Sequence, residues 1–215
     1  MGKSETIAAN YEEISARIAA AGGAGRTAIV AVSKTQGVDV IRAARQCGIV
    51  DFGENYAREL IDKAVVFEQP QLRWHMIGAL QSRTIAPLGP HVALWHTVSR
   101  AKEIELLARV RSGTRILIQV DFSGVAGRNG AALNQVASLV EYGREYGLDV
   151  AGLMVVTPLV GLSERAKIFG KTYRLGTSLG LKEFSMGMSD DYEPAVQEGS
   201  TIVRIGRAIF GERQS

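Results

Sequence analysis

The segment 27–67, TAIVAVSKTQGVDVIRAARQCGIVDFGENYARELIDKAVVF, decides the fold because it shows the same pattern twice. Two short apolar runs, at 27–33 and 49–53, have the length and the β-branched content of buried parallel strands. A stretch with helical spacing follows each run, at 38–47 and from residue 54 onward. The segment therefore predicts two consecutive strand-helix units of a parallel sheet.

The rest of the chain continues this alternation. Six more apolar runs read as strands, each followed by a helix or a helical turn: 72–78, 92–98, 115–122, 148–156, 183–188 and 200–206. The sequence thus predicts an α/β protein with a closed (β/α)8 TIM barrel. The alternative is an open doubly wound sheet, but eight units without a dinucleotide-binding fingerprint fit the barrel more simply.

The length and composition fit one barrel domain. The chain has 215 residues, of which 46% are hydrophobic and 22% charged, and this suits a single globular domain over 1–215. Residues 4–21 have the spacing of an amphipathic helix, with Ser4 as its expected cap, and the glycine-rich stretch 22–25 follows. We therefore expect residues 1–25 to form an extra N-terminal helix and a connector.

Charge and hydropathy argue against several classes of partner. The net charge of +3 is spread along the chain without a basic block, so no nucleic acid is expected. Because about 18 consecutive apolar residues, the length that a spanning helix needs, occur nowhere, the sequence predicts no membrane partner and a cytoplasmic location. The lone cysteine, Cys47, is interpreted as a small core residue.

Polar residues just after the strands are the candidates for chemistry, because the active site of a barrel lies at the carboxyl ends of its strands. Lys34 follows the first strand directly. A lysine held on a rigid element in a partly desolvated pocket can form a Schiff base through its neutral amine. A lysine at a strand end can equally extend its charge into solvent. The position of Lys34 alone leaves both interpretations open.

The last two units favour the chemical interpretation. The stretches SMGMS (185–189) and GSTIVRIGRAIFG (199–211) place hydroxyl groups and glycine amides after strands seven and eight, where barrels frequently bind phosphate. Ser185, with Ser200 or Thr201, offers donors, and Gly206 allows close backbone approach. The plainer interpretation is closure of the barrel by a glycine-containing unit. Together, a Schiff-base lysine and a phosphate site describe a pyridoxal 5'-phosphate (PLP) site.

Seven motifs extend this pattern over most of the chain: AVSKT (31–35), FGENY (52–56), WHMIGALQS (74–82), HTVSRAKE (96–103), ILIQVDFSG (116–124), GLMVV (152–156) and SMGMSDDYEPAVQEGSTIVRIGRAIFG (185–211). In this order and spacing the sequence resembles the pyridoxal phosphate homeostasis protein family. That family is similar in turn to the N-terminal barrel of alanine racemase.

The resemblance implies a position for each part of the cofactor. PLP would be held as an internal aldimine on Lys34, with Asn55 beside it and Met154 near the ring. Arg204 would face the pyridine nitrogen and keep it unprotonated, which makes the ring a poorer electron sink. The phosphate would be held by four further residues: Ser185, Ser200, Thr201 and Gly206.

The sequence also bears on whether the protein is an enzyme. Racemisation needs a second acid or base on the face of the cofactor opposite the lysine. In alanine racemase this group is a tyrosine from a second domain, and we expect no segment of this sequence to form such a domain. His75 and His96 could be bases, but each lies in a strand pattern and is better interpreted as a core or rim histidine.

We therefore expect a non-catalytic protein of PLP homeostasis, a monomer that carries the cofactor and gives it to PLP-dependent apo-enzymes. The alternatives are a small PLP-dependent amino-acid racemase and a barrel without a cofactor, in which Lys34 is only solvated.

Overall fold

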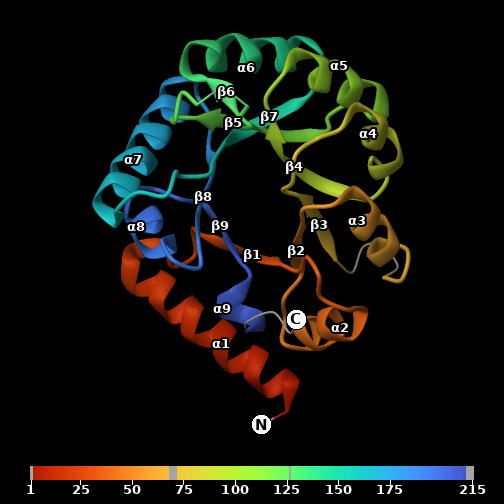
Figure 1. The fold of residues 1–215 in the computed structure, drawn as a ribbon, viewed down its shortest axis with the longest axis vertical. Coiled ribbons are helices and arrows are strands. Elements are labelled where there is room, and N and C mark those ends of the chain that lie inside the picture. The colour runs from red at the N-terminus through yellow and green to blue at the C-terminus, as the bar shows by residue number, and fades with distance from the viewer. Residues whose placement is uncertain (1, 68–71, 126, 212–215) are drawn as a thin grey trace.

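The computed structural model describes residues 2–67, 72–125 and 127–211. These residues form a closed barrel of eight parallel strands, viewed nearly along its axis in Figure 1. The strands are β1 (Ala28–Val32), β2 (Asp51–Glu54), β3 (Arg73–Met76), β4 (Val92–Val98), β5 (Arg115–Asp121), β7 (Asp149–Val155), β8 (Glu183–Met188) and β9 (Ile202–Ile205). The prediction of a (β/α)8 barrel is confirmed.

Two pairings close the barrel. The strand order runs β4-β3-β2-β1-β9-β8-β7-β5, and β4 also pairs with β5. The last strand, β9, lies between β1 and β8, with Ala28 opposite Ile202 and Ala31 opposite Ile205. The first and last strands of the sequence are therefore neighbours, and residues that follow them meet at the same end of the barrel.

Helices surround the barrel on the outside (Figure 1). They are α2 (Val38–Gln46), α3 (Ala57–Ala64), α4 (Ser82–Leu88), α5 (Ala101–Val110), α6 (Val136–Glu145), α7 (Leu162–Ser178), α8 (Tyr192–Gln197) and the single turn α9 (Arg207–Phe210). Each follows one barrel strand, as the alternating pattern predicted.

The connection between β5 and α6 contains a short extra strand that the sequence analysis did not predict. A two-residue strand, β6 (Ala131–Ala132), pairs with the end of β5, and a 3-10 turn (Leu133–Gln135) precedes α6. Gly130, which precedes β6, allows this pairing. Its φ is +127°, and a Cβ at Gly130 would lie 2.8 Å from the backbone nitrogen of Asp121. Only glycine allows the backbone to pass this close to β5.

The predicted N-terminal helix is present as α1 (Lys3–Ile18), followed by one π-helical turn, Ala19–Gly23. The cap is Gly2 and not Ser4, which lies inside the helix with its hydroxyl 3.7 Å from Sγ of Cys47. Figure 1 shows α1 crossing beside α8, α9 and α2, and Nδ2 of Asn10 donates to the carbonyl of Ile209 at 2.9 Å. The helix thus joins the first and last units of the barrel.

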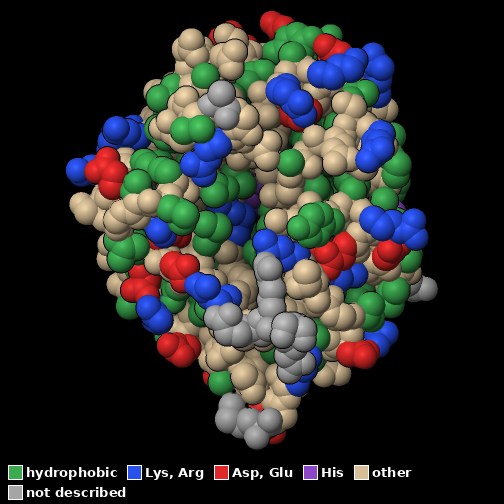
Figure 2. Space-filling view, viewed as in Figure 1, with side chains coloured by type: hydrophobic (Ala, Val, Ile, Leu, Met, Phe, Trp, Pro, Cys, Tyr) green, Lys and Arg blue, Asp and Glu red, His purple; other side chains and the backbone are tan. Residues whose placement is uncertain are grey.

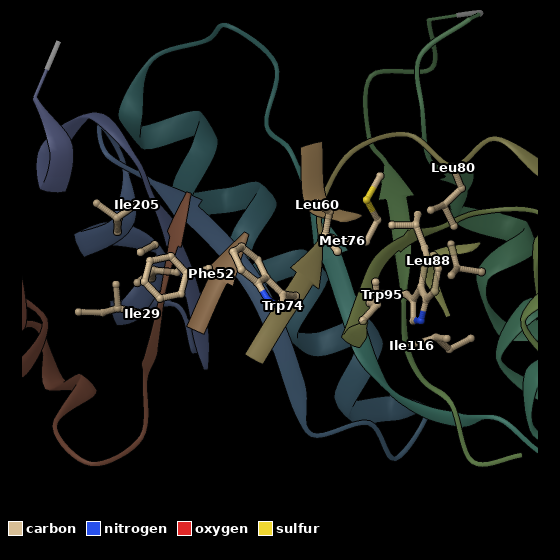
Figure 3. Close-up of a cluster of buried hydrophobic side chains, with 14 of the residues drawn as sticks. Ile29, Phe52, Leu60, Trp74, Met76, Leu80, Leu88, Trp95, Ile116 and Ile205 are labelled. Carbon is tan, nitrogen blue, oxygen red and sulfur yellow. The ribbon is translucent and has the colours of Figure 1, made fainter. Parts of the chain in front are cut away.

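Alternate side chains of β1 belong to two different apolar clusters, as the period of two in a strand requires. Ile29 and Ala31 of β1 belong to the large core between the strands and the helices, which also contains Trp74 and Trp95 (Figure 3). In that core the rings of Phe52 and Trp74 lie 5.7 Å apart. A smaller cluster fills the lumen of the barrel and consists of Val30, Leu94, Leu117, Met154 and Ile202.

Candidate functional site

A pocket of about 310 Å³ lies where the chain leaves β1 and β9. Lys34 from the first connection and Gly206 from the last one line it, because β1 and β9 are paired and end at the same rim. The other lining residues are Val32, Gln36, Arg207, Phe210 and Gly211. Figure 2 looks onto the face that carries α9 and shows it hollowed near its centre, with Lys or Arg side chains in the hollow. We call the pocket lined by these seven residues the mouth pocket.

The turn that carries Lys34 is fixed at several points. Thr35 has a φ of +66°, which is rare for a β-branched residue, and its backbone nitrogen donates to Oε1 of Glu59 at 2.5 Å. The backbone nitrogen of Ser33 donates to the carbonyl of Gly53 at 3.0 Å. Lys34 is therefore displayed on a constrained turn and is itself half-buried.

A buried ion cluster lies beneath this turn. Nζ of Lys63 donates to Oε1 of Glu54, to Oε1 of Glu59 and to the carbonyl of Ser33, each at 2.7 Å. The hydroxyl of Ser33 donates to the same oxygen of Glu54 at 2.7 Å. Burial raises the pKa of the Glu54 carboxyl, and the hydrogen bonds from Lys63 and Ser33 oppose that rise. The cluster holds the residue before Lys34 by both its backbone and its side chain.

Arg204 and Ser185 form a second polar centre inside the barrel. Nη1 of Arg204 donates to Oγ of Ser185 at 2.6 Å and to its carbonyl at 2.7 Å, while Nη2 donates to the carbonyl of Val155 at 2.9 Å. Because the side chain is buried, the pKa of Arg204 is lowered to about 10, although the Asp191 carboxylate opposes this. The guanidinium reaches from β9 to the last residue of β7, beneath the rim.

The two strand histidines continue from Ser185 across the lumen. Oγ of Ser185 lies 2.9 Å from Nδ1 of His96, and Nε2 of His96 lies 2.9 Å from Nδ1 of His75. Nε2 of His75 lies 3.1 Å from Oδ1 of Asp51, which Arg73 also binds through two hydrogen bonds. Burial lowers the pKa of His96 well below its usual value, so this imidazole is neutral. Both rings are buried and hydrogen-bonded, in agreement with their interpretation as core histidines.

Met154 and Asn55 lie close to these centres but do not line the mouth pocket. Met154 is buried in the lumen cluster, and its Cα is opposite that of Ser185 in the β7-β8 register. Asn55 follows β2, and its backbone packs closely on Gly78. A Cβ added at Gly78 would lie 1.9 Å from the Asn55 carbonyl oxygen. Asn55 is thus held at the rim, and Met154 below it.

The structure does not bring Ser200 and Thr201 to this end of the barrel. Both precede β9, and the backbone nitrogen of Ala28, the first residue of β1, donates to the Thr201 carbonyl at 2.8 Å. Oγ1 of Thr201 accepts from the backbone nitrogen of Phe184, and the Ser200 hydroxyl is fully buried among backbone carbonyls of β8 and β9. They lie at the amino ends of the strands, so the expectation that they meet a phosphate beside Gly206 is wrong.

The sequence analysis placed Glu54 and Arg207 after their strands, but it did not predict the ion cluster or the contribution of Gln36 and Phe210 to the mouth pocket. Gln36 lies two residues after Lys34 and Phe210 four residues after Gly206, so their positions past the strand ends could have identified them. The ion cluster gave one local signal, the spacing of Glu59 and Lys63 one helical turn apart. Within the described ranges, no group of three or more metal-ligating side chains and no helix able to cross a membrane is found.

Comparison with known proteins extends the resemblance from motifs to the whole chain. Residues 3–214 match the model of the alanine racemase N-terminal domain family. The chain is 37% identical to the pyridoxal phosphate homeostasis protein of Pseudomonas aeruginosa, over 97% of this chain and 96% of the relative. It is 38% identical to the protein of the same name from Vibrio cholerae, over 97% of each chain.

Solved structures agree with this assignment. PipY of Synechococcus elongatus, solved with PLP bound, superposes with a TM-score of 0.81 at 29% identity, covering 92% of this chain and all of that one. A lysine decarboxylase from Selenomonas ruminantium shares the fold, with a TM-score of 0.72 at 13% identity, and this chain corresponds to 60% of its length. Together with the matched family model and the curated relatives, this shows that the chain belongs to the alanine racemase N-terminal domain family and, within it, to the pyridoxal phosphate homeostasis proteins.

Proposed function

We propose that the mouth pocket binds PLP and that Nζ of Lys34 forms a covalent C=N bond with the aldehyde carbon of the cofactor, releasing one water. The observation that carries this proposal is the meeting of Lys34 and Gly206 in one pocket at the seam between β1 and β9. The relatives named as PLP homeostasis proteins and the PLP-bound PipY structure support the choice of ligand.

The residues at this end of the barrel fit the cofactor. A volume of about 310 Å³ lies within the range of small-ligand sites. Gly206 keeps one wall free, since a Cβ there would lie 3.3 Å from the Cβ and the carbonyl oxygen of Val32. Arg207 lines the same pocket and supplies positive charge for a phosphate. When bound, PLP supplies an electrophilic aldehyde and an electron-withdrawing ring.

Arg204 is proposed to face the ring nitrogen from below the rim. Three hydrogen bonds from its guanidinium to Ser185 and Val155 fix its plane, and they leave two of its five N–H groups without an acceptor among the described residues. A guanidinium donates hydrogen bonds and keeps its protons, so it favours an unprotonated ring nitrogen. Asn55 and Met154 are proposed to contact the cofactor from the rim and the lumen. Ser185 was expected to hold the phosphate, but its hydroxyl is bound to Arg204 and His96, so it is proposed to act through Arg204 instead.

We propose a carrier role for this barrel domain in PLP homeostasis, with no catalysis of its own, as a monomer in the cytoplasm that delivers PLP to apo-enzymes. Among the described residues that line the mouth pocket, only Lys34 and Arg207 have titratable side chains. Because the pKa of a guanidinium is very high, Arg207 stays protonated and cannot accept a proton, so these lining residues include no acid-base pair that could face both sides of the cofactor. This supports reversible holding of the cofactor over amino-acid racemisation.

The covalent link is tested by absorption and chemical trapping. Purified protein mixed with PLP is expected to absorb at the edge of the visible range as a protonated Schiff base, and borohydride is expected to fix the cofactor on a peptide containing Lys34. Lys34→Ala should abolish both signals, whereas Lys102→Ala, which removes an exposed lysine, should keep both. Cofactor fixed on another lysine would refute the assignment.

The carrier role is tested by transfer and by chirality. The loaded protein is expected to restore activity to a PLP-dependent apo-enzyme while L-alanine and other L-amino acids keep their configuration. Racemisation at rates typical of enzymes, about 1 per second or faster, would instead establish the racemase alternative.

A further inference from the structure

A row of hydrogen bonds crosses the barrel lumen from Arg204 to a second cavity at the amino ends of the strands. This cavity, of about 410 Å³, is lined by Asp51 and His75 among other residues. From there the row runs through His96 and Ser185 to the guanidinium of Arg204. It therefore connects the amino-end cavity with the group that lies beneath the mouth pocket.

The two ends of the row determine every hydrogen position between them. Asp51 is ionised, since the hydrogen bonds from His75 and Arg73 outweigh the effect of burial and lower its pKa to about 2. An ionised carboxylate only accepts, so Nε2 of His75 must carry a hydrogen. In neutral His75, Nδ1 is then an acceptor.

The same reasoning continues to Ser185. Because Nδ1 of His75 accepts, Nε2 of His96 must donate, and Nδ1 of neutral His96 must accept. The only hydrogen available to that nitrogen is the hydroxyl hydrogen of Ser185. Oγ of Ser185 then offers its lone pairs to Arg204, which donates to it at 2.6 Å. Both imidazoles are thus Nε2–H tautomers and every partner is satisfied.

We propose that Ser185, His96 and His75 are positioning residues for Arg204, and that their hydrogen-bond row reverses when His75 becomes protonated. The link to the cofactor rests on the proposed function, but the row itself belongs to the protein alone. If the two histidines only filled space, the row would not need a fixed donor and a fixed acceptor in each hydrogen bond.

The reversal follows from the same donor and acceptor rules. The reversed row holds one hydrogen more than the starting row, and a proton from solvent supplies it. His96 gives its Nε2 hydrogen to Nδ1 of His75 and takes the hydroxyl hydrogen of Ser185 on its own Nδ1, and the solvent proton replaces the hydrogen on Oγ of Ser185. His75 then carries hydrogens on both ring nitrogens, so its Nδ1 is a donor. His96 stays neutral and must accept at Nε2, and its hydrogen is then on Nδ1. Oγ of Ser185 now accepts from both His96 and Arg204, and its own hydrogen turns away. The hydrogen bond that fixes Arg204 is then shared with a second donor.

Charges around His75 come from several elements. Asp51 on β2 is hydrogen-bonded to His75 and to Arg73, which lies on the same strand as His75. Other charged groups lining the same cavity are Arg26, Arg115 and Glu183. Burial lowers the pKa of His96, and the nearby His75 and Arg204 lower it further, so His96 remains the neutral member of the pair.

Nitrogen-15 NMR of the histidine rings tests the row without any cofactor. The chain has three histidines, and the third, His91, serves as the internal reference. At neutral pH, His75 and His96 are both expected to carry their hydrogen on Nε2. On acidification, Nδ1 of His75 should become protonated, and the hydrogen of His96 should move to Nδ1 in the same step. A His96 that starts as the Nδ1–H tautomer, or one that keeps Nε2–H while His75 titrates, would overturn the inference, as would unfolding before His75 titrates.

Absorption of the loaded protein tests the link to the cofactor. The spectrum of bound PLP is expected to change in the pH step in which His75 titrates. His75→Gln removes the titrating group and should remove that step, while His91→Gln should keep it. Persistence of the step in His75→Gln would overturn the coupling to Arg204. If the protein failed to bind PLP at all, the proposed function would fall while the NMR result on the row would stand.

Discussion

Nζ of Lys63 lies 2.7 Å from Oε1 of Glu54 in the interior of the protein, directly beneath the turn that displays Lys34. Both side chains are almost completely buried. Lys63 also donates to the carbonyl of Ser33, so this ion pair is part of the support of the mouth pocket. Its loss should affect both folding stability and the position of Lys34.

Lys63→Met should lower the free energy of unfolding by about 3–5 kcal/mol, because it leaves the Glu54 carboxylate buried without its cation. The double variant with Glu54→Gln removes both charges and should recover part of this loss. Urea denaturation measures both effects. Asp62→Asn, which breaks the exposed pair with Arg58, is the control and should cost at most about 1 kcal/mol. Equal effects of Lys63→Met and Asp62→Asn would contradict the buried cluster.

Asp51 should make stability fall in acid. Its pKa is about 2 in the folded protein against an ordinary value of 3.8, so the folded state favours the ionised carboxylate. The resulting stability, on the order of 1–2 kcal/mol, is present above pH of about 4 and is lost as the pH falls toward about 2. Asp51→Asn should flatten the unfolding free energy across this window. A variant with the same acid dependence as the parent chain would remove Asp51 as its source.

Gly78→Ala should be strongly destabilising, by about 3 kcal/mol or more, since its Cβ would overlap the Asn55 carbonyl and the backbone would have to move. The shift would displace Asn55, so PLP affinity should fall as well. Gly37→Ala is the matched control, because nothing lies within 4 Å of its added Cβ. Thermal unfolding and PLP titration measure the two effects. Wild-type stability in Gly78→Ala would show that the space between Gly78 and the Asn55 carbonyl can hold a methyl group.

Arg204→Ala should weaken PLP binding or shift the spectrum of the bound cofactor, because the fixed donor beneath the ring is lost. It also leaves the Ser185 and Val155 carbonyls without this donor, at a cost of about 1–3 kcal/mol each. Arg204→Lys keeps the charge but cannot form the planar fork, so it should recover stability only in part. The control is Arg111→Ala, an exposed position. Unchanged affinity and spectrum in Arg204→Ala would exclude Arg204 from the site.

Local patterns predicted the barrel because each strand and helix has its own signal. The runs at 92–98 and 183–188 match β4 and β8 residue for residue. The site was harder to predict. Ser200 and Thr201 immediately precede the stretch Ile-Val-Arg-Ile-Gly, yet its first four residues form β9, which places them at the opposite end of the barrel from Gly206. Proximity in sequence therefore misplaced them.

The contacts that could not be predicted from the sequence are tertiary contacts between different strands and helices. The pairing of Glu54 with Lys63 depends on how α3 folds back over the end of β2, and no spacing rule gives that geometry. The same holds for the contact between His75 and His96, whose strands are neighbours with a register shift between Trp74 and His75. The sequence did indicate that both histidines lie in strands, which was enough to predict their burial but not their partner.

The position of β9 between β1 and β8 has a consequence for biosynthesis. Lys34 is made before Gly206 and Arg207, which form the facing wall of the mouth pocket. No nascent chain that lacks β9 can assemble this pocket, because the seam beside β1 has no partner strand until then. The pocket therefore forms only after β9 has been made and has paired with β1, so its formation reports contact between segments that are far apart in the sequence.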